Sequence, residues 1–172
     1  MHLPRSAWML VALVLLARVA AEPTVVLSEF MADNTRTLRD VDGEYSDWIE
    51  LENLSSAPVN LDGWRLTDDP RHRSTWALPA TNLPPGGFLI VFASGKNRRI
   101  SGEELHASFR LAAEGEYLAL LTPELAVANA FSPTFPAQLP DVAYGWSRAV
   151  SSQPLVPPGG AVRIHVPTAG NL

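Results

Sequence analysis

The chain has 172 residues, of which 47% are hydrophobic and 18% charged, and its formal net charge is −5. This composition supplies enough apolar material for one packed domain and excludes a disordered or fibrous chain. The sequence contains no cysteine, which excludes disulfides, thiolate metal sites and a cysteine nucleophile.

Residues 1–21 have the pattern of a secretory signal peptide. Arg5 gives a positive start, an apolar run covers Ala7–Ala17, and small residues precede Glu22. A membrane-spanning helix needs about 20 apolar residues, so we expect export, and a secreted or cell-surface mature chain without a membrane span. Removal of the leader takes away Arg5 and Arg18 but no acid, which changes the net charge from −5 to −7. An acidic chain repels phosphates, so nucleic-acid binding is disfavoured.

After the leader, short apolar stretches alternate with turns rich in Pro, Gly, Asn and Asp. The clearest stretch is Trp48–Asn53, where Ile49 and Leu51 alternate with Glu50 and Glu52. This period of two is typical of a half-buried strand. The pattern therefore places the Ile49 and Leu51 side chains in the core and both glutamates on the solvent side.

Further strands are expected along the whole mature chain. Phe88–Ala93 is apolar throughout, which predicts a strand buried on both faces, and Glu103–Arg110 has a short helix as its alternative. Short strands at this spacing predict an all-β sandwich or barrel of about nine strands. The other expected strands are Val25–Phe30, Val59–Leu61, Trp64–Thr67, Thr75–Leu78, Leu105–Leu111, Tyr117–Leu121, Ala126–Phe131 and Val142–Trp146.

Six segments follow one another in a fixed order along residues 25–146: Leu27–Asn34, Asp42–Asn53, Val59–Pro70, Leu83–Lys96, Leu105–Leu120 and Asp141–Gly145. Together they resemble the lamin tail domain as it occurs in secreted bacterial proteins. The resemblance implies an immunoglobulin-like β-sandwich, here over residues 22–150. The usual basic residue after the Tyr-Gly pair is replaced by Trp146, which loosens the match at its edge. Family members in nuclear lamins are linked to DNA and protein partners, but the acidic charge argues against DNA here.

Residues 151–172 look like the connector that leads to further modules in large secreted proteins with this domain. The sequence VPPGG at 156–160 repeats the device LPPGG at 83–87 and precedes an expected strand, Ala161–Val166. Proline fixes φ and glycine permits positive φ, so this device starts a strand compactly. We expect a truncated product whose last strand lacks a partner. The alternative is a natural terminal strand that pairs back onto the sandwich.

The loop before Trp48 carries the sharpest chemical pattern, with acidic residues at Asp40, Asp42, Glu44 and Asp47. Calcium takes six to eight oxygen ligands, so Asp40, Asp42 and Asp47 are candidate calcium ligands, with Glu44 as a further donor. The spacing does not match an EF-hand. In the alternative, which we favour, these carboxylates accept backbone N–H groups and fix the shape of a long loop.

No constellation in the sequence predicts catalysis. Adjacent acids at Asp68 and Asp69 point apart in an extended segment, so turn capping is favoured over a general acid–base pair. His72, His106 and His165 are single and lack metal-ligand spacing. No serine lies in a Gly-x-Ser-x-Gly motif. The sequence therefore predicts that the chain is not an enzyme.

Two surface features have more than one interpretation. The basic cluster Lys96, Arg98 and Arg99 is expected to be a solvated loop rather than a site for an anionic polymer. Trp146, near a strand end, is equally compatible with the core and with an exposed sugar-binding position. The other tryptophans of the mature chain are expected in the core, at Trp48, Trp64 and Trp76.

The function expected from these features is a non-catalytic, extracellular interaction or spacer module of a bacterial surface or secreted protein. Its partners would be neighbouring domains, cell-surface proteins or polysaccharide, and it would be monomeric. No cofactor is expected, and a calcium ion at the acidic loop is the less favoured alternative. The alternatives are a calcium-dependent binding domain and an accessory domain of a larger secreted hydrolase or nuclease.

Overall fold

The computed structural model describes residues 24–72 and 76–146, and these residues form eleven strands and no helix. The strands are β1 (Val25–Met31), β2 (Trp48–Asn53), β3 (Val59–Asn60), β4 (Arg65–Thr67), β5 (Trp76–Ala77), β6 (Asn82–Leu83), β7 (Phe88–Phe92), β8 (Leu105–His106), β9 (Leu118–Leu121), β10 (Val127–Phe131) and β11 (Tyr144–Gly145).

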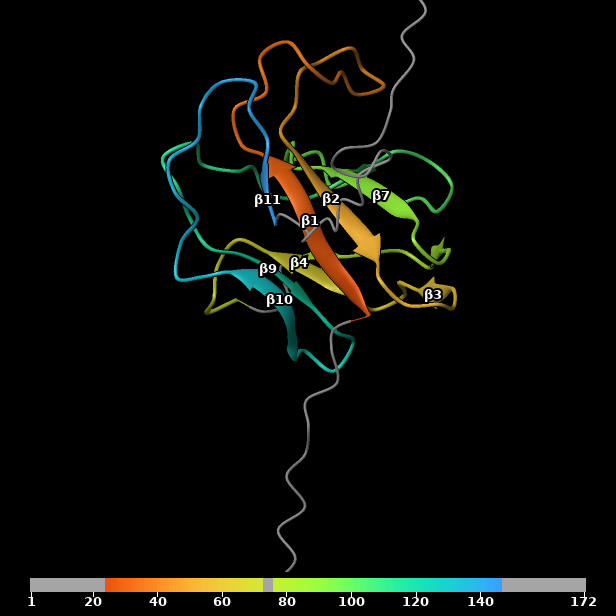
Figure 1. Ribbon diagram of the computed structural model, residues 1–172. Coiled ribbons are helices and arrows are strands. Elements are labelled where there is room, and N and C mark those ends of the chain that lie inside the picture. The colour runs from red at the N-terminus through yellow and green to blue at the C-terminus, as the bar shows by residue number, and fades with distance from the viewer. Residues whose placement is uncertain (1–23, 73–75, 147–172) are drawn as a thin grey trace, which may run out of the picture.

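Two main sheets form a sandwich (Figure 1). One sheet has five strands in the order β11-β1-β2-β7-β8, and the other has four in the order β10-β9-β4-β5. A small third sheet pairs β3 with β6. The all-β prediction is confirmed. No helix in the described ranges is long and apolar enough to cross a bilayer.

The core lies between the two main sheets. Leu27, Phe30 and Ile49 from one sheet and Leu66 and Leu120 from the other are all fully buried in one cluster. Each such side chain contributes about 1.5–3 kcal/mol by its removal from water. The alternating apolar positions of the sequence therefore supply the contact that holds the two layers together.

A β-bulge interrupts the pairing of β1 with β2 between Leu27 and Glu29. The extra residue, Ser28, lies outside the ladder, so Leu27 and Phe30 both reach the core although they are three positions apart. Directly opposite residues share a face, and the shifted register therefore places Glu29 beside Glu50 on the outer face of the sheet.

The strand predictions were accurate where alternation was strong. Trp48–Asn53 is a strand with the predicted bounds. The expected strand Leu105–Leu111 was wrong in length, because only Leu105–His106 pairs with β7 and the chain then continues as loop with an isolated bridge at Arg110. The short strand Asn82–Leu83 was missed because it lies inside a turn-rich segment.

Two burial predictions were also wrong. Phe88 is 56% exposed and the next two residues of β7 are half-buried, so only the end of the strand, at Val91 and Phe92, is buried on both faces. Glu52, expected in solvent, is only 5% exposed. Its paired residues on the outer face are Val26 and Phe88.

The signal peptide predicted at residues 1–21, the connector at 151–172 and the strand at Ala161–Val166 lie outside the described residues.

Candidate functional site

The pairing of β2 with β7 brings two distant loops together. The strands are antiparallel, and Trp48 at the start of β2 lies opposite Phe92 at the end of β7. The loop that enters β2 and the loop that leaves β7 therefore emerge at the same end of the sheet (Figure 1). The first carries the acidic residues and the second carries the basic cluster.

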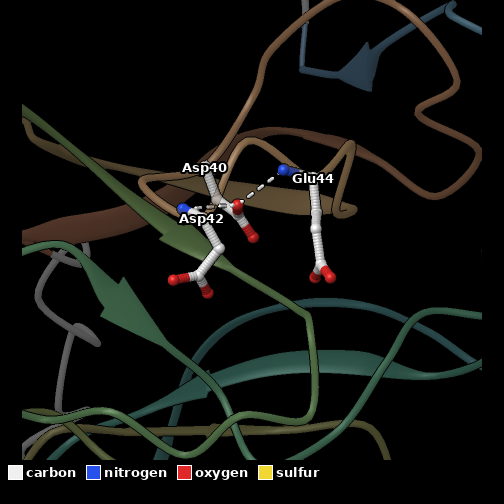
Figure 2. Close-up of side chains that lie close together, drawn as sticks. All are labelled: Asp40, Asp42 and Glu44. Atoms are coloured by element: carbon white, nitrogen blue, oxygen red, sulfur yellow. Dashed lines mark hydrogen bonds between the residues drawn. The ribbon is translucent and has the colours of Figure 1, made fainter.

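Asp40 organises the acidic loop. Its carboxylate is buried and accepts hydrogen bonds from the backbone N–H of Asp42 (3.0 Å) and Glu44 (2.9 Å), as Figure 2 shows. The Ser46 hydroxyl donates a third hydrogen bond at 2.9 Å. Gly43 turns the chain with a φ of 80° and donates its N–H to the Asp40 carbonyl. Asp40 therefore fixes the shape of the loop by accepting hydrogen bonds, which is the role that the sequence favours.

Lys96 reaches from the other loop into the centre of the acidic group. Its Nζ lies 2.5 Å from Asp40, 2.6 Å from Asp42 and 2.9 Å from Glu44. The Lys96 side chain is only 19% exposed. Arg98 adds a second contact, with an ion pair of 2.8 Å to Asp42. The two loops thus form one charge cluster, which we call the lysine–carboxylate cluster.

The cluster shifts the pKa values of its members. Burial alone would raise the pKa of Asp40, but the hydrogen bonds from Lys96, Glu44 and Ser46 outweigh it and lower that pKa from 3.8 to about 2. For Lys96, burial lowers the pKa, and the three carboxylates outweigh that effect and raise the pKa above its usual range. Asp40 and Lys96 are therefore both held in their charged forms.

The interpretation of Lys96 as part of a solvated loop was wrong. Its ammonium is an ion-pair partner of the acidic loop, and Arg98 shares that role while remaining 43% exposed. Arg99 is exposed as expected. The ion pair follows from the antiparallel pairing of β2 with β7. This pairing brings the acidic loop before β2 and the basic loop after β7 to the same end of the sheet.

Only part of the predicted calcium set is brought together. Oxygens of Asp40, Asp42 and Glu44 lie within 4.8 Å of one another, which suits a cation. Asp47 is placed differently: it accepts the N–H of Asn34 at 3.2 Å, and burial raises its pKa. Because Lys96 Nζ contacts all three grouped carboxylates, a calcium ion would have to displace the ammonium.

A buried hydrogen-bond chain beside this cluster was missed from the sequence. Ser94 Oγ lies 2.9 Å from His106 Nδ1, and His106 Nε2 lies 3.0 Å from Glu104. Glu104 also accepts the N–H of Val41, at the tip of the acidic loop (2.7 Å). The His106 ring is fully buried and stacks on Phe92. The chain of contacts therefore ties the loop tip to the sheet.

Of the adjacent acids Asp68 and Asp69, the second caps a turn as the sequence predicts. Asp69 accepts the backbone N–H of Arg71 at 2.8 Å and also contacts the Arg71 guanidinium and the His72 ring. These hydrogen bonds hold the pKa of Asp69 well below its usual value. For Asp68, burial raises the pKa.

A second surface feature lies at the opposite edge of the sheet, on β11 and the residues before it. Large apolar side chains are exposed here, and we call them the apolar edge: Leu139 (67%), Val142 (52%), Tyr144 (39%) and Trp146 (59%). One face of the Trp146 ring stacks on Phe131, with centroids 5.1 Å apart and planes at 13°. Trp146 is therefore exposed, and its ring is held from one side.

The backbone of the apolar edge is fixed at both ends. Trp146 donates its N–H to the Ser28 carbonyl at 3.1 Å. Asp141 accepts the N–H groups of Thr35 and Arg36, both at 2.8 Å, and forms an ion pair with the Arg36 side chain. Next to Trp146 lies a groove of about 370 Å³, whose walls are Ser28, Glu29, Glu50, Gly145 and Trp146.

Comparison with known proteins supports the resemblance drawn from the sequence. The family model described as Lamin Tail Domain matches residues 18–134, a range that contains β1 to β10. No curated protein matches the chain. Since the matched range is more than half of the chain and the structure is an all-β sandwich, the protein belongs to the lamin tail domain family, whose members are immunoglobulin-like domains.

Proposed function

We propose that this chain is a non-catalytic interaction module of a secreted or cell-surface bacterial protein, and that it binds its partner through the apolar edge. The observation that carries the proposal is the exposure of Leu139, Val142, Tyr144 and Trp146 in one short segment. Contiguous exposed apolar groups on a soluble domain are typical of interaction sites. The leader-like pattern of residues 1–21 supports the extracellular location.

The geometry of the edge favours binding. Association costs free energy when side chains and loops must be ordered. Here the Asp141 hydrogen bonds and the pairing of β11 with β1 already order the backbone, and Phe131 orders the Trp146 ring. Tryptophan and tyrosine also dominate the energetics of many interfaces. A partner would therefore meet a surface that needs little rearrangement.

The Ser94–His106–Glu104 chain does not favour catalysis, although it contains a hydroxyl, an imidazole and a carboxylate. A general base must come within hydrogen-bond reach of a substrate proton. His106 is fully buried and Ser94 is only 4% exposed, and both ring nitrogens already have partners. These hydrogen bonds are better explained as support for the acidic loop.

Retention of the purified full chain on surface fractions tests the proposal. The fractions are bacterial cell wall, extracted surface polysaccharide and extracted surface proteins, each on a solid support. We expect one fraction to retain the wild-type chain and to lose most of that retention with Trp146→Ala and Val142→Ser. The matched control is Phe88→Ser, which removes an apolar side chain of similar exposure (56%) from β7. Equal retention of all variants would contradict the proposal.

Calcium-dependent binding is the second candidate function. It is favoured by the three carboxylates of Asp40, Asp42 and Glu44, whose oxygens lie within 4.8 Å of one another, and carboxylates are the ligands that calcium prefers. Calorimetric titration of the full chain with calcium tests it. Heat of binding with a rise in melting temperature would support a calcium site. The absence of both signals would rule this candidate out.

A further inference from the structure

A polar pocket lies where three segments meet, at the end of the five-stranded sheet from which the acidic and basic loops emerge. The Asp47 carbonyl accepts the N–H of Ala93 at 2.7 Å, and Gly95 donates its N–H to the Phe109 carbonyl at 3.0 Å. These backbone hydrogen bonds join the segments to one another. The pocket has a volume of about 340 Å³, within the range of small-molecule sites, and its walls are residues 44–47, Ala93, Ser94 and Arg110.

Most polar side chains in these walls already have partners within the domain. The Glu44 carboxylate belongs to the lysine–carboxylate cluster. The Ser46 hydroxyl donates to Asp40, and the Ser94 hydroxyl belongs to the buried hydrogen-bond chain. Two charged groups in the walls keep unused hydrogen-bonding capacity, and their charges are opposite in sign.

Arg110 is the positive group. Its Nε donates to the Ser94 carbonyl at 3.1 Å, and a Cβ on Gly95 would lie 3.5 Å from the same nitrogen, so the side chain is held against the backbone of this segment. No carboxylate among residues 24–72 and 76–146 forms an ion pair with Arg110. Its terminal nitrogens are therefore available, and they form the planar fork that binds a carboxylate through two hydrogen bonds.

Asp47 is the negative group. One of its oxygens accepts the N–H of Asn34 at 3.2 Å, and no group in the described part of the chain donates to the other oxygen. Burial raises the pKa of Asp47, whereas the Asn34 hydrogen bond and the charge of Arg110 oppose that effect. The two charged groups thus interact across the pocket without direct contact. Because a half-buried charge with incomplete pairing is costly, both groups would gain from a guest that supplies the missing partners.

The two opposite charges discriminate between classes of guest. A simple anion would pair with Arg110 but would also meet the carboxylates of Asp47 and Glu44. A simple cation would pair with Asp47 but would be repelled by Arg110. A molecule that carries both an ammonium and a carboxylate satisfies both groups. It is also electrically neutral as a whole, so the net charge of −5 does not repel it.

We infer that this pocket binds a small zwitterion of the α-amino acid class, with its carboxylate on the Arg110 guanidinium and its ammonium on the second oxygen of Asp47. The walls are mostly polar, which favours an amino acid with a small side chain. The inference goes beyond the proposed interaction through the apolar edge and does not depend on it.

Glycine is the probe, because it carries both charges and no side chain. Methylamine and acetate are the matched controls, since each keeps one of the two charges. Each compound is titrated at neutral pH into the purified full chain, and NMR follows the signals of the Arg110 Nε–H and the Ser94 N–H. We expect a saturable shift with glycine. Each control should bind at least roughly tenfold more weakly, because it lacks one charge-assisted contact.

Variants of the two charged residues test the same contacts from the side of the protein. Asp47→Asn and Arg110→Gln each remove one charge and should each lower the affinity for glycine roughly tenfold, as reported by the Ser94 N–H signal. Thermal unfolding shows whether each variant folds. The matched controls are Asp62→Asn and Arg99→Gln, which remove the same charges from exposed positions outside the pocket and should leave the affinity unchanged.

Several results would overturn the inference. They are the lack of a saturable shift with glycine, binding of methylamine or acetate as tight as that of glycine, full affinity in either pocket variant, and an equal loss in the control variants. Retention on the surface fractions tests the apolar edge separately. A chain that binds glycine but is retained by no fraction would overturn the proposed function alone.

Discussion

Replacement of Lys96 by methionine tests whether the lysine–carboxylate cluster holds the two loops together. Methionine keeps an apolar stem of similar length but removes the ammonium that contacts Asp40, Asp42 and Glu44. The variant leaves three carboxylates close together without a cation. We expect the folded state to lose stability because these charges then repel one another and Asp40 is too buried to be solvated.

The size of the effect follows from exposure. Removal of one partner from a buried ion pair costs about 3–5 kcal/mol, whereas an exposed pair contributes about 0–1 kcal/mol. The Asp40 side chain is fully buried, Lys96 is 19% exposed and Glu44 is 65% exposed. Only the Asp40 contact therefore counts as buried, and we expect a loss of about 2–4 kcal/mol. For a domain of this size the melting temperature should fall by about 10 °C.

Urea denaturation followed by circular dichroism measures the free energy of unfolding, and thermal melting gives the midpoint. The control is Arg99→Met, which removes the same charge from an exposed neighbour in the same loop. Surface substitutions of this kind usually change stability by about 0.5 kcal/mol or less. A loss for Lys96→Met that is equal to the control, or below about 1 kcal/mol, would refute the claim that the ammonium holds the loops.

Three further predictions follow from the same structure. The pKa of Asp40 is lowered from 3.8 to about 2, so its contribution to folding stability is present above pH 3.8 and is lost as the pH falls to about 2. Between these pH values the wild-type free energy of unfolding should fall by roughly 1–2 kcal/mol more than that of Lys96→Met, after allowance for solvent screening. Urea titrations at each pH measure the difference. Asp68→Asn should raise the melting temperature at neutral pH and change it little near pH 3, because burial raises the pKa of Asp68 and so penalises its charged form; an equal effect at both pH values would contradict this. Gly145→Ala should destabilise the folded state by about 1–3 kcal/mol and weaken binding at the apolar edge, because a Cβ at this position meets the Ser28 carbonyl oxygen. Unchanged Trp146 fluorescence together with an unchanged melting temperature would contradict this prediction.

The fold was predictable because its signals are local. Alternation in Trp48–Asn53 gave a strand with the observed bounds, and breaker residues marked most loops. The errors occur where pairing decides the outcome. Leu105–Leu111 has strand-like composition, but only Leu105 and His106 find a partner in β7. Glu52 alternates as a solvent-facing residue should, but it is only 5% exposed.

The candidate sites were only half predictable for the same reason. The acidic loop was visible in sequence because Asp40, Asp42 and Glu44 are close neighbours along the chain. Its partner Lys96 is more than fifty residues away, and only the register of β2 with β7 reveals the contact. The pairing of Glu29 with Glu50 depends on a bulge, which shifts the register by one residue and has no reliable signal in sequence.

Deletion of the bulge residue Ser28 would affect the core packing of β1 and the hydrogen bonds of its outer surface differently. Without Ser28 the strand would alternate regularly, with Val25, Leu27 and Phe30 all still directed inward. A deletion at this position would thus leave the packing between the sheets intact. It would remove the carbonyl that accepts the Trp146 N–H and the hydroxyl that donates to Glu50. The additional residue serves the outer surface alone, and relatives that gain or lose it would keep the same core while differing in what they can hold.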